Sequence, residues 1–224
     1  MAGDEEIPET TPAGGRPRPI YRGIEGEDFG RILALSDGIF AFAMTLLALS
    51  LTVPVVHGST PAAQSGNLLN RLLADGPLFF GYAFAFVMIA VWWIIHNRTF
   101  QYIARYDSAV VWINMVLLIQ IAFMPFVLSL FNDYSTTQVA VDLFAVIQIT
   151  LGVTNLALWE YCRNHHLLKP NIPAGIARYY TYRGLLASGI FAVSIGVSFI
   201  SVSFAEYVWI GTFIVQRFAL RPRN

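Results

Sequence analysis

Six long apolar runs follow one another along the chain, and they constrain its fold more than any other feature of the sequence. A helix needs about 20 mainly apolar residues to cross the hydrocarbon core of a bilayer. Hydrophobic residues make up 56% of the 224 residues and charged residues only 12%, whereas soluble domains carry about 25% charged residues. The sequence therefore predicts an all-α integral membrane protein with six transmembrane helices, and it excludes a large soluble domain.

Polar, Pro- or Gly-containing stretches divide the chain into the expected spans. Residues 1–30 are rich in Pro, Gly, Glu and Arg, which is typical of a mobile tail and not of a signal peptide. We expect a transmembrane domain over 31–220 and a short C-terminal tail over 221–224, with a polar loop between the first two spans. The expected spans are 31–53, 77–95, 108–131, 137–159, 182–200 and 204–220.

The basic residues predict the orientation of these spans. If the N-terminus is cytoplasmic, all of the 14 Lys and Arg residues except Arg71 fall on the cytoplasmic side. The positive-inside rule accounts for such an asymmetry, and it places both termini in the cytoplasm. The formal net charge of zero gives no sign of a nucleic-acid-binding surface. The single cysteine, Cys162, excludes an intrachain disulfide and a thiolate metal cluster, and no cofactor is expected.

Two polar residues, Ser36 and Asp37, lie inside the first apolar run. An ionisable side chain at this depth is costly unless it faces protein or water. One interpretation is a polar knot that fixes how the first helix packs, formed with Arg31 and with groups on other spans. The alternative is an interfacial carboxylate near a helix start, where the helix dipole favours it. Candidate partners at the same depth are Trp93, His96 and Asn114.

The stretch from Arg31 through Leu35, Ser36 and Asp37 to Gly38 resembles a known signature. It is similar to the R-x-x-x-F-S-D motif of the lysosomal and bacterial potassium channel family known as transmembrane protein 175. The resemblance extends to WWIIHNRTF at the end of the second span, and to Asn114 and FMPF in the third. It covers the first three spans, while the last three are similar in number and hydrophobicity.

The resemblance implies a potassium-permeable cation channel that is passive and is not an enzyme. Bacterial family members have six helices per chain and form tetramers, so a homotetramer is implied, with the first helix lining the pore. The signature then forms a polar brace, namely Arg31, Ser36, Asp37, Trp93, His96 and Asn114, which holds the first helix against the second and third. The family lacks the carbonyl filter of other potassium channels, and no TVGYG occurs here. The implied partners are potassium ions, further copies of the chain and the bilayer of a prokaryotic plasma membrane.

Helical spacing indicates which side chains would line the pore. Phe42, Thr45, Leu46 and Leu49 share one stripe of the first helix, which we call the pore stripe. By composition alone, such a stripe is typical of a buried or lipid-facing surface. The resemblance instead implies that Phe42 forms the narrowest apolar ring and Thr45 a hydroxyl ring. Two residues depart from the family pattern: Leu35 replaces a Phe, and Phe42 replaces an Ile and could narrow the pore or turn aside.

Two other classes of function can be compared with the channel. A secondary transporter or proton pathway would use Asp37 and His96, together with Asp142 and Glu206, but the sequence has no inverted repeat. An intramembrane hydrolase would need a zinc or nucleophile motif, and neither H-E-x-x-H nor G-x-S-x-G occurs. Asp142, Gln148 and Glu206 are interpreted as helix contacts and not as site residues.

Overall fold

The computed structural model describes residues 27–170 and 172–218, and this part of the chain is helical. Residues 1–26 of the expected N-terminal tail over 1–30, and the expected C-terminal tail over 221–224, lie outside the described residues. The first helix begins at Glu27, four residues before the expected boundary at residue 31. The described helices are α1 (Glu27–Leu46), the 3-10 helix η1 (Leu47–Ser50), α2 (Pro61–Ala74), α3 (Gly76–Gln101), α4 (Ser108–Tyr134), α5 (Gln138–Asn164), α6 (Ala174–Ser198) and α7 (Val202–Phe218).

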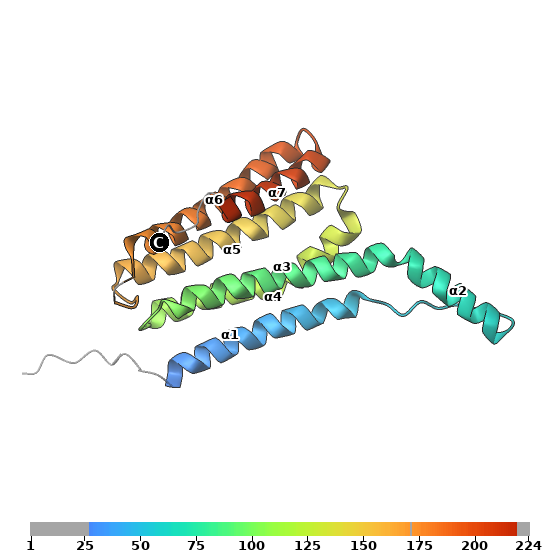
Figure 1. Ribbon diagram of the computed structural model, residues 1–224, viewed down its shortest axis with the longest axis horizontal. Helices are drawn as coiled ribbons and strands as arrows, with labels where there is room; N and C mark the ends of the chain where they lie inside the picture. Colours follow the sequence, from blue (N-terminus) through green and yellow to red (C-terminus); the bar gives the residue numbers. More distant parts are fainter. Residues whose placement is uncertain (1–26, 171, 219–224) are drawn as a thin grey trace, which may run out of the picture.

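Among the described residues, four helices are long and apolar enough to cross a membrane, by length and composition. These are Phe29–Ser50, Gly76–Gln101, Ser108–Tyr134 and Gln138–Asn164. The chain is therefore a multi-pass membrane protein. The remaining two expected spans are less apolar or shorter: α6 carries Arg178 and Arg183 among many Gly and Ser residues, and α7 has 17 residues. Both run alongside α5 (Figure 1).

The prediction of a polar loop between the first two spans is wrong. Thr60 caps the start of α2 by accepting a hydrogen bond from the Ala63 amide, and Pro61 occupies the first turn, where it has no amide to leave unpaired. Four leucines, Leu68, Leu69, Leu72 and Leu73, recur on one side of this helix, but they form no continuous apolar run. Figure 1 shows α2 projecting beyond the end of the helical bundle.

The other helix boundaries also differ from the expected ones. The first span ends as a 3-10 turn at Ser50, so residues 51–53 are not helical. The predicted broken connector over 163–178 is shorter, because α5 continues to Asn164 and α6 begins at Ala174. Pro125 lies inside α4 without ending it, as neighbouring helices in a membrane protein allow.

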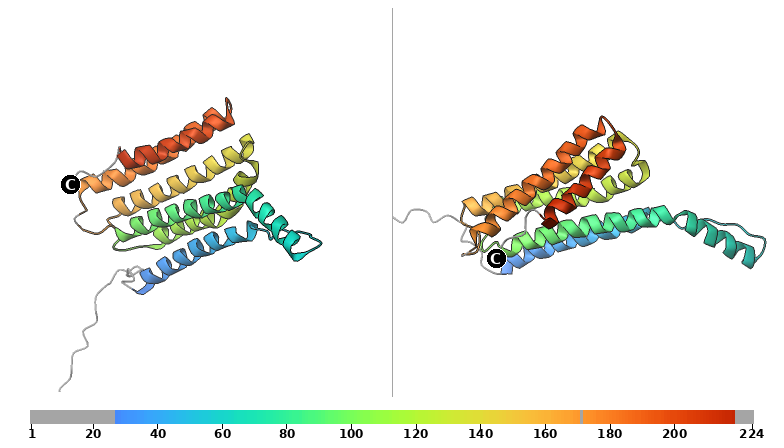
Figure 2. Two further views of the ribbon diagram at one scale, coloured as in Figure 1. Left: turned by 45° about the vertical axis from the view of Figure 1, so that its right-hand side comes forward. Right: turned by 45° about the horizontal axis from the view of Figure 1, so that its top comes forward.

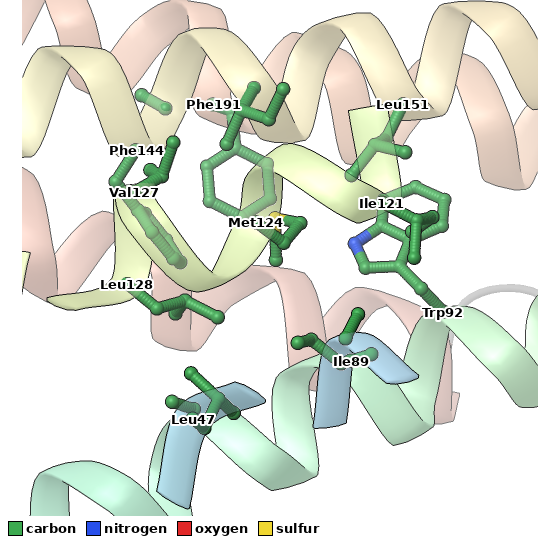
Figure 3. Close-up of a cluster of buried hydrophobic side chains, with 14 of the residues drawn as sticks. Leu47, Ile89, Trp92, Ile121, Met124, Val127, Leu128, Phe144, Leu151 and Phe191 are labelled. Carbon is green, nitrogen blue, oxygen red and sulfur yellow. The ribbon is translucent and has the colours of Figure 1, made fainter. Parts of the chain in front are cut away.

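The helices pack in layers, which Figures 1 and 2 show from three directions. Helix α1 packs against α3 and α4, and α4 packs against α5, which in turn packs against α6. Helix α7 lies mainly against α6. The largest buried cluster fills the space between these layers (Figure 3). Its most deeply buried members include Phe40, Ile89, Ile121, Met124, Phe144 and Leu151, each at most 1% exposed.

Close approach of α5 and α6 depends on small residues. A Cβ atom added to Gly152 would lie 2.3 Å from Ser188 Oγ, and one added to Gly184 would lie 3.3 Å from the Leu156 side chain. Small residues of this kind let membrane helices pack with their backbones close together.

The linkers on one end of the bundle are paired through their main chains. The Ala104 amide donates to the Leu167 carbonyl at 2.8 Å, and the Lys169 amide donates to the Tyr102 carbonyl at 2.8 Å. Close by, Asp107 caps α4 by accepting from the Val110 amide, and its other oxygen accepts from the Tyr161 hydroxyl at 2.7 Å. These bonds tie the α3–α4 linker to α5 and to the linker that follows it. The start of α1 lies at the same end of the molecule, and α2 lies at the opposite end (Figure 1).

Candidate functional site

The structure joins three of the expected polar residues in one buried chain of hydrogen bonds between α1, α4 and α3. Asn114 Nδ2 donates to Ser36 Oγ at 3.0 Å, and Asn114 Oδ1 lies 2.9 Å from His96 Nε2. Ser36 and Asn114 are fully buried, and His96 is 1% exposed. Because Asn114 Nδ2 can only donate, its Oδ1 is the acceptor, so His96 Nε2 carries the hydrogen in this bond. Ser36 Oγ in turn donates to the Ile32 carbonyl at 2.9 Å.

A further hydrogen bond connects α1 to α3 beside these buried hydrogen bonds. Trp93 Nε1 donates to Asp37 Oδ1 at 2.7 Å. The Asp37 side chain is on the exposed side of α1, and Trp93 is half-buried. Arg31 also lies at an exposed position of α1, five residues before Ser36. Five of the six brace residues thus make hydrogen bonds to one another, while the part that Arg31 plays stays a prediction.

Aromatic rings pack around His96, the histidine of the buried hydrogen bonds. The His96 ring stacks on Phe100 with centroids 4.4 Å apart, and Phe40 lies 5.4 Å away on the α1 side. Both phenylalanines are at most 1% exposed. We did not single out either residue from the sequence, although Phe40 follows Ser36 by one helical turn and so shares its face. These rings keep water away from the hydrogen bonds and hold the imidazole in place.

Helix α1 has two sharply different faces. The face that carries Ser36 continues through Phe40, Ala43 and Leu47, all of which are at most 2% exposed. The pore stripe lies on the other side: Phe42 is 64% and Leu49 is 77% exposed, Thr45 is exposed, and Leu46 is half-buried. Leu35, which replaces the signature phenylalanine, is 49% exposed and lies two helical turns before Phe42. The polar contacts therefore hold α1 by its buried face. The described part of the chain leaves the apolar stripe on the opposite face uncovered.

The hydroxyl of Thr45, in the pore stripe, makes a hydrogen bond within its own helix. Thr45 Oγ1 donates to the Phe42 carbonyl at 2.9 Å. A hydroxyl has one hydrogen to donate and two lone pairs that accept. The Thr45 oxygen therefore keeps acceptor capacity on the exposed side of α1.

Two of the three polar residues that we assigned to helix contacts, Asp142 and Gln148, bond to neighbouring helices, while the contact expected of Glu206 stays a prediction. Ser198 Oγ on α6 donates to Asp142 Oδ1 on α5 at 2.6 Å. Trp92 Nε1 on α3 donates to Gln148 Oε1 on α5 at 2.7 Å. Cys162 is fully buried near the end of α5. Among the residues that the structure describes, no cluster of three or more His, Cys, Asp or Glu side chains could hold a metal ion.

The family model and the similar proteins indicate the same protein family. Residues 31–125, from α1 into α4, match the family described as endosomal/lysosomal potassium channel TMEM175. A protein named as a potassium channel from Streptomyces collinus is 31% identical over 77% of this chain and 83% of its own length. Another, from Chamaesiphon minutus, is 31% identical over 80% of this chain and 88% of its own length.

A solved structure supports the same conclusion. The crystal structure of a lysosomal potassium-selective channel TMEM175 homolog from Chamaesiphon minutus aligns with a TM-score of 0.66 and 29% identity. The alignment covers 89% of this chain and all of that one. With a relative that is 31% identical over most of both chains, the protein belongs to the TMEM175 family.

Proposed function

We propose that the chain is one subunit of a homotetrameric, potassium-permeable cation channel, with α1 of each subunit lining the pore. The observation that carries this proposal is the division of α1 into a braced, buried face and an exposed stripe with Phe42 and Thr45. A closed ring of identical subunits would bring the same stripe from every copy to the symmetry axis. The names of the relatives support potassium as the permeant ion.

The proposed pore selects ions without a filter of backbone carbonyls. A ring of Phe42 side chains would form a hydrophobic constriction, and such constrictions gate by dewetting. Potassium gives up its hydration shell at a lower cost than sodium does, so a narrow apolar ring favours it. The free acceptor capacity of the Thr45 hydroxyls, one turn further along α1, would replace part of that shell. We expect selectivity weaker than that of a carbonyl filter.

The same proposal includes six spans per chain and a defined orientation. Helices α6 and α7 run alongside α5, which supports their crossing the membrane with it (Figure 2). The linkers with Arg105 and Lys169 lie at the end of the bundle where α1 begins, while Arg71 lies on α2 at the other end. The positive-inside rule then favours cytoplasmic termini. The bacterial relatives named as potassium channels support the plasma membrane as the location.

The reversal potential under a potassium/sodium gradient tests the proposed function. Purified protein in planar bilayers, with potassium on one side and sodium on the other, should give currents that reverse toward the potassium equilibrium potential. The shift should be smaller than that of a channel with a carbonyl filter, because the constriction has no carbonyl rings. Protein-free bilayers are the control. Folded, inserted protein that carries no current, or current that reverses at zero, would contradict the proposal.

The role of Asp37 separates the channel from a proton-coupled transporter. Asparagine also accepts a hydrogen bond through its Oδ1, so Asp37→Asn should keep the bond from Trp93 and leave the potassium current within about twofold of the wild type. Asp37→Leu removes that acceptor and should reduce the amount of folded protein. Flux measurements on both variants in proteoliposomes check this. Loss of flux in folded Asp37→Asn protein would show that Asp37 must ionise, as a transporter requires.

A further inference from the structure

A groove with a volume of about 250 Å³ lies between α3 on one side and α5, α6 and α7 on the other. Helix α3 packs on α1 and α4, whereas α6 packs on α5 and α7, so the groove runs between two groups of helices. Its described lining residues come from α3, α5, α6 and α7 and not from α1. The groove is therefore separate from the pore stripe, and the proposed ion pathway does not use it.

The groove has a buried floor and partly exposed apolar walls. Its floor includes Trp92 on α3 and Phe144 on α5, which Figure 3 shows with Phe191 of α6 beside them. On α6, Gly184 and Ala187 form part of one wall, and both are half-buried. The other wall is a stripe of half-buried side chains on α3, namely Phe84, Met88, Val91 and Ile95. Inside a bilayer, such an open apolar groove can take a hydrocarbon chain.

One end of the groove carries two positive charges. Arg183 on α6 lines this end, and its Cζ lies 6.0 Å from the ring centroid of Tyr179, one turn nearer the start of α6. Arg98 on α3 is exposed and follows Ile95 by three residues, so it continues the apolar stripe beyond the groove. Both guanidinium groups interact electrostatically with Tyr180, which also lines the groove. The two facing helices therefore bring their charges to the same end.

The acidic side chains around the groove leave this end positive. Glu206 also lines the groove, but it lies one helical turn after the start of α7, toward the opposite end. Glu160 on α5 accepts a hydrogen bond from Thr181 and pairs with Arg163, so its charge is compensated. An anionic group is therefore attracted to the end with the two arginines and repelled from the other end.

The length of the groove fits one leaflet of the bilayer. The α3 stripe from Phe84 to Ile95 extends about 17 Å along the helix axis, and half of the hydrocarbon core is about 15 Å thick. The end with the two arginines lies toward the linkers that carry Arg105 and Lys169. The proposed orientation places these linkers in the cytoplasm. A lipid of the cytoplasmic leaflet would therefore have its head group at the arginines and an acyl chain along the groove.

Charge complementarity favours a phospholipid with a net negative charge. Guanidinium groups form charge-assisted hydrogen bonds with phosphate oxygens. In a zwitterionic lipid, the ammonium group of the head would lie close to the same two guanidinium groups and be repelled by them. Basic pockets between membrane helices on the cytoplasmic side are typical binding sites for anionic head groups.

We infer that the groove between α3 and α6 binds one anionic phospholipid, with an acyl chain along the apolar walls and the phosphate held by Arg98 and Arg183. The choice of the cytoplasmic leaflet rests on the orientation in the proposed function, while the binding itself does not. The bound lipid contacts α3 on one side and α6 on the other, and so stabilises the packing of the two groups of helices.

Thermal unfolding of the purified full chain in lipid nanodiscs tests the inference. Phosphatidylglycerol replaces phosphatidylcholine in rising fractions, and the midpoint of unfolding is followed, because a ligand that binds only the folded state raises it. We expect the midpoint to rise by about 2–4 °C and then to level off, as the filling of a site requires. Inorganic phosphate added to nanodiscs of pure phosphatidylcholine should give no such rise, because it has no acyl chain.

Three variants separate the site from the general charge of the protein. Arg98→Gln/Arg183→Gln removes both charges and should abolish the rise. Arg105→Gln is the matched control, since it removes an exposed charge from the linker at the same end of the bundle and should keep the rise. Ala187→Leu fills the groove from α6 and keeps both arginines, so it should also abolish the rise. If the double variant does not fold, Arg98→Gln alone, at its exposed position, should give a smaller rise than Arg105→Gln.

Several results would overturn the inference. A wild-type midpoint that does not rise, or that rises without levelling off, would show that no site is filled, and an equal rise with inorganic phosphate would show that the acyl chain is not bound. A full rise in Arg98→Gln/Arg183→Gln or in Ala187→Leu would place the lipid elsewhere. The midpoint does not depend on ion conduction, so folded protein that carries no potassium current would contradict the proposed function and leave the lipid result unchanged.

Discussion

Replacing Asn114 by leucine is expected to lower the free energy of unfolding by about 2–3 kcal/mol, because it leaves buried polar groups without partners. Asn114 connects α4 to both Ser36 and His96, and it is fully buried. Leucine has a similar volume, so the loss would come from the hydrogen bonds and not from an empty space. Ser36 keeps its bond to the Ile32 carbonyl, whereas His96 would lose its partner at 1% exposure.

Hydrogen bonds between membrane helices average only about 0.6 kcal/mol, because the separated helices find other partners. The expected loss at Asn114 exceeds this average because one amide serves two helices inside a shell of aromatic rings. The measurement is an equilibrium unfolding titration of the full chain in mixed micelles.

Gln120→Leu on the same helix is the matched control for this measurement. Gln120 makes one half-buried bond to Thr154, and its Oε1 is buried and has no partner in the described part of the chain. Its removal should cost less than about 1 kcal/mol, since it also removes an unsatisfied oxygen. Equal stability of the two variants would show that Asn114 does not hold α1 in place.

The second large effect, on potassium current and selectivity, is expected from a substitution at the proposed constriction. Phe42→Ala should raise the potassium current several-fold and move the reversal potential toward zero, because it would remove the apolar ring that excludes hydrated ions. Phe42 is 64% exposed and contributes nothing to the buried core of the chain, so the variant should fold as the wild type does. Single-channel recordings under the same potassium/sodium gradient give both quantities.

A phenylalanine of equal exposure is available as a control. Phe204 on α7 is 66% exposed and lies in the layer farthest from α1. Phe204→Ala should leave the current and its reversal potential unchanged. Phe42→Ile should keep an apolar ring and retain a potassium preference. If Phe42→Ala conducts and selects as the wild type does, another residue forms the constriction.

Hydropathy predicted the positions of the six long helices because each long apolar run has to cross or face the bilayer. It missed α2 for the same reason: the leucines of this helix stand in two pairs separated by Asn70 and Arg71, and they form no long apolar run. The approximate depth of Ser36, His96 and Asn114 followed from the spans. Their hydrogen bonds did not, because these depend on the rotation of three helices about their own axes.

Contacts between distant segments could not be predicted from single-residue patterns. Gln148 and Trp92 are 56 positions apart, and nothing in their local sequence indicates that they meet. The bond between Tyr161 and Asp107 likewise joins the end of α5 to the start of α4. The sequence did indicate which types of residue needed partners, since polar side chains inside apolar runs are costly.

The hydrogen bond from Thr45 to the Phe42 carbonyl has a consequence for biogenesis. A threonine that faces lipid without a partner would make a newly inserted subunit unstable, but here the donor is satisfied within a single turn of its own helix. Five of the six brace residues likewise bond to one another within a single chain. In the proposed homotetramer, a subunit would therefore be able to insert and fold as a monomer, and to meet its neighbours in a separate second stage of assembly.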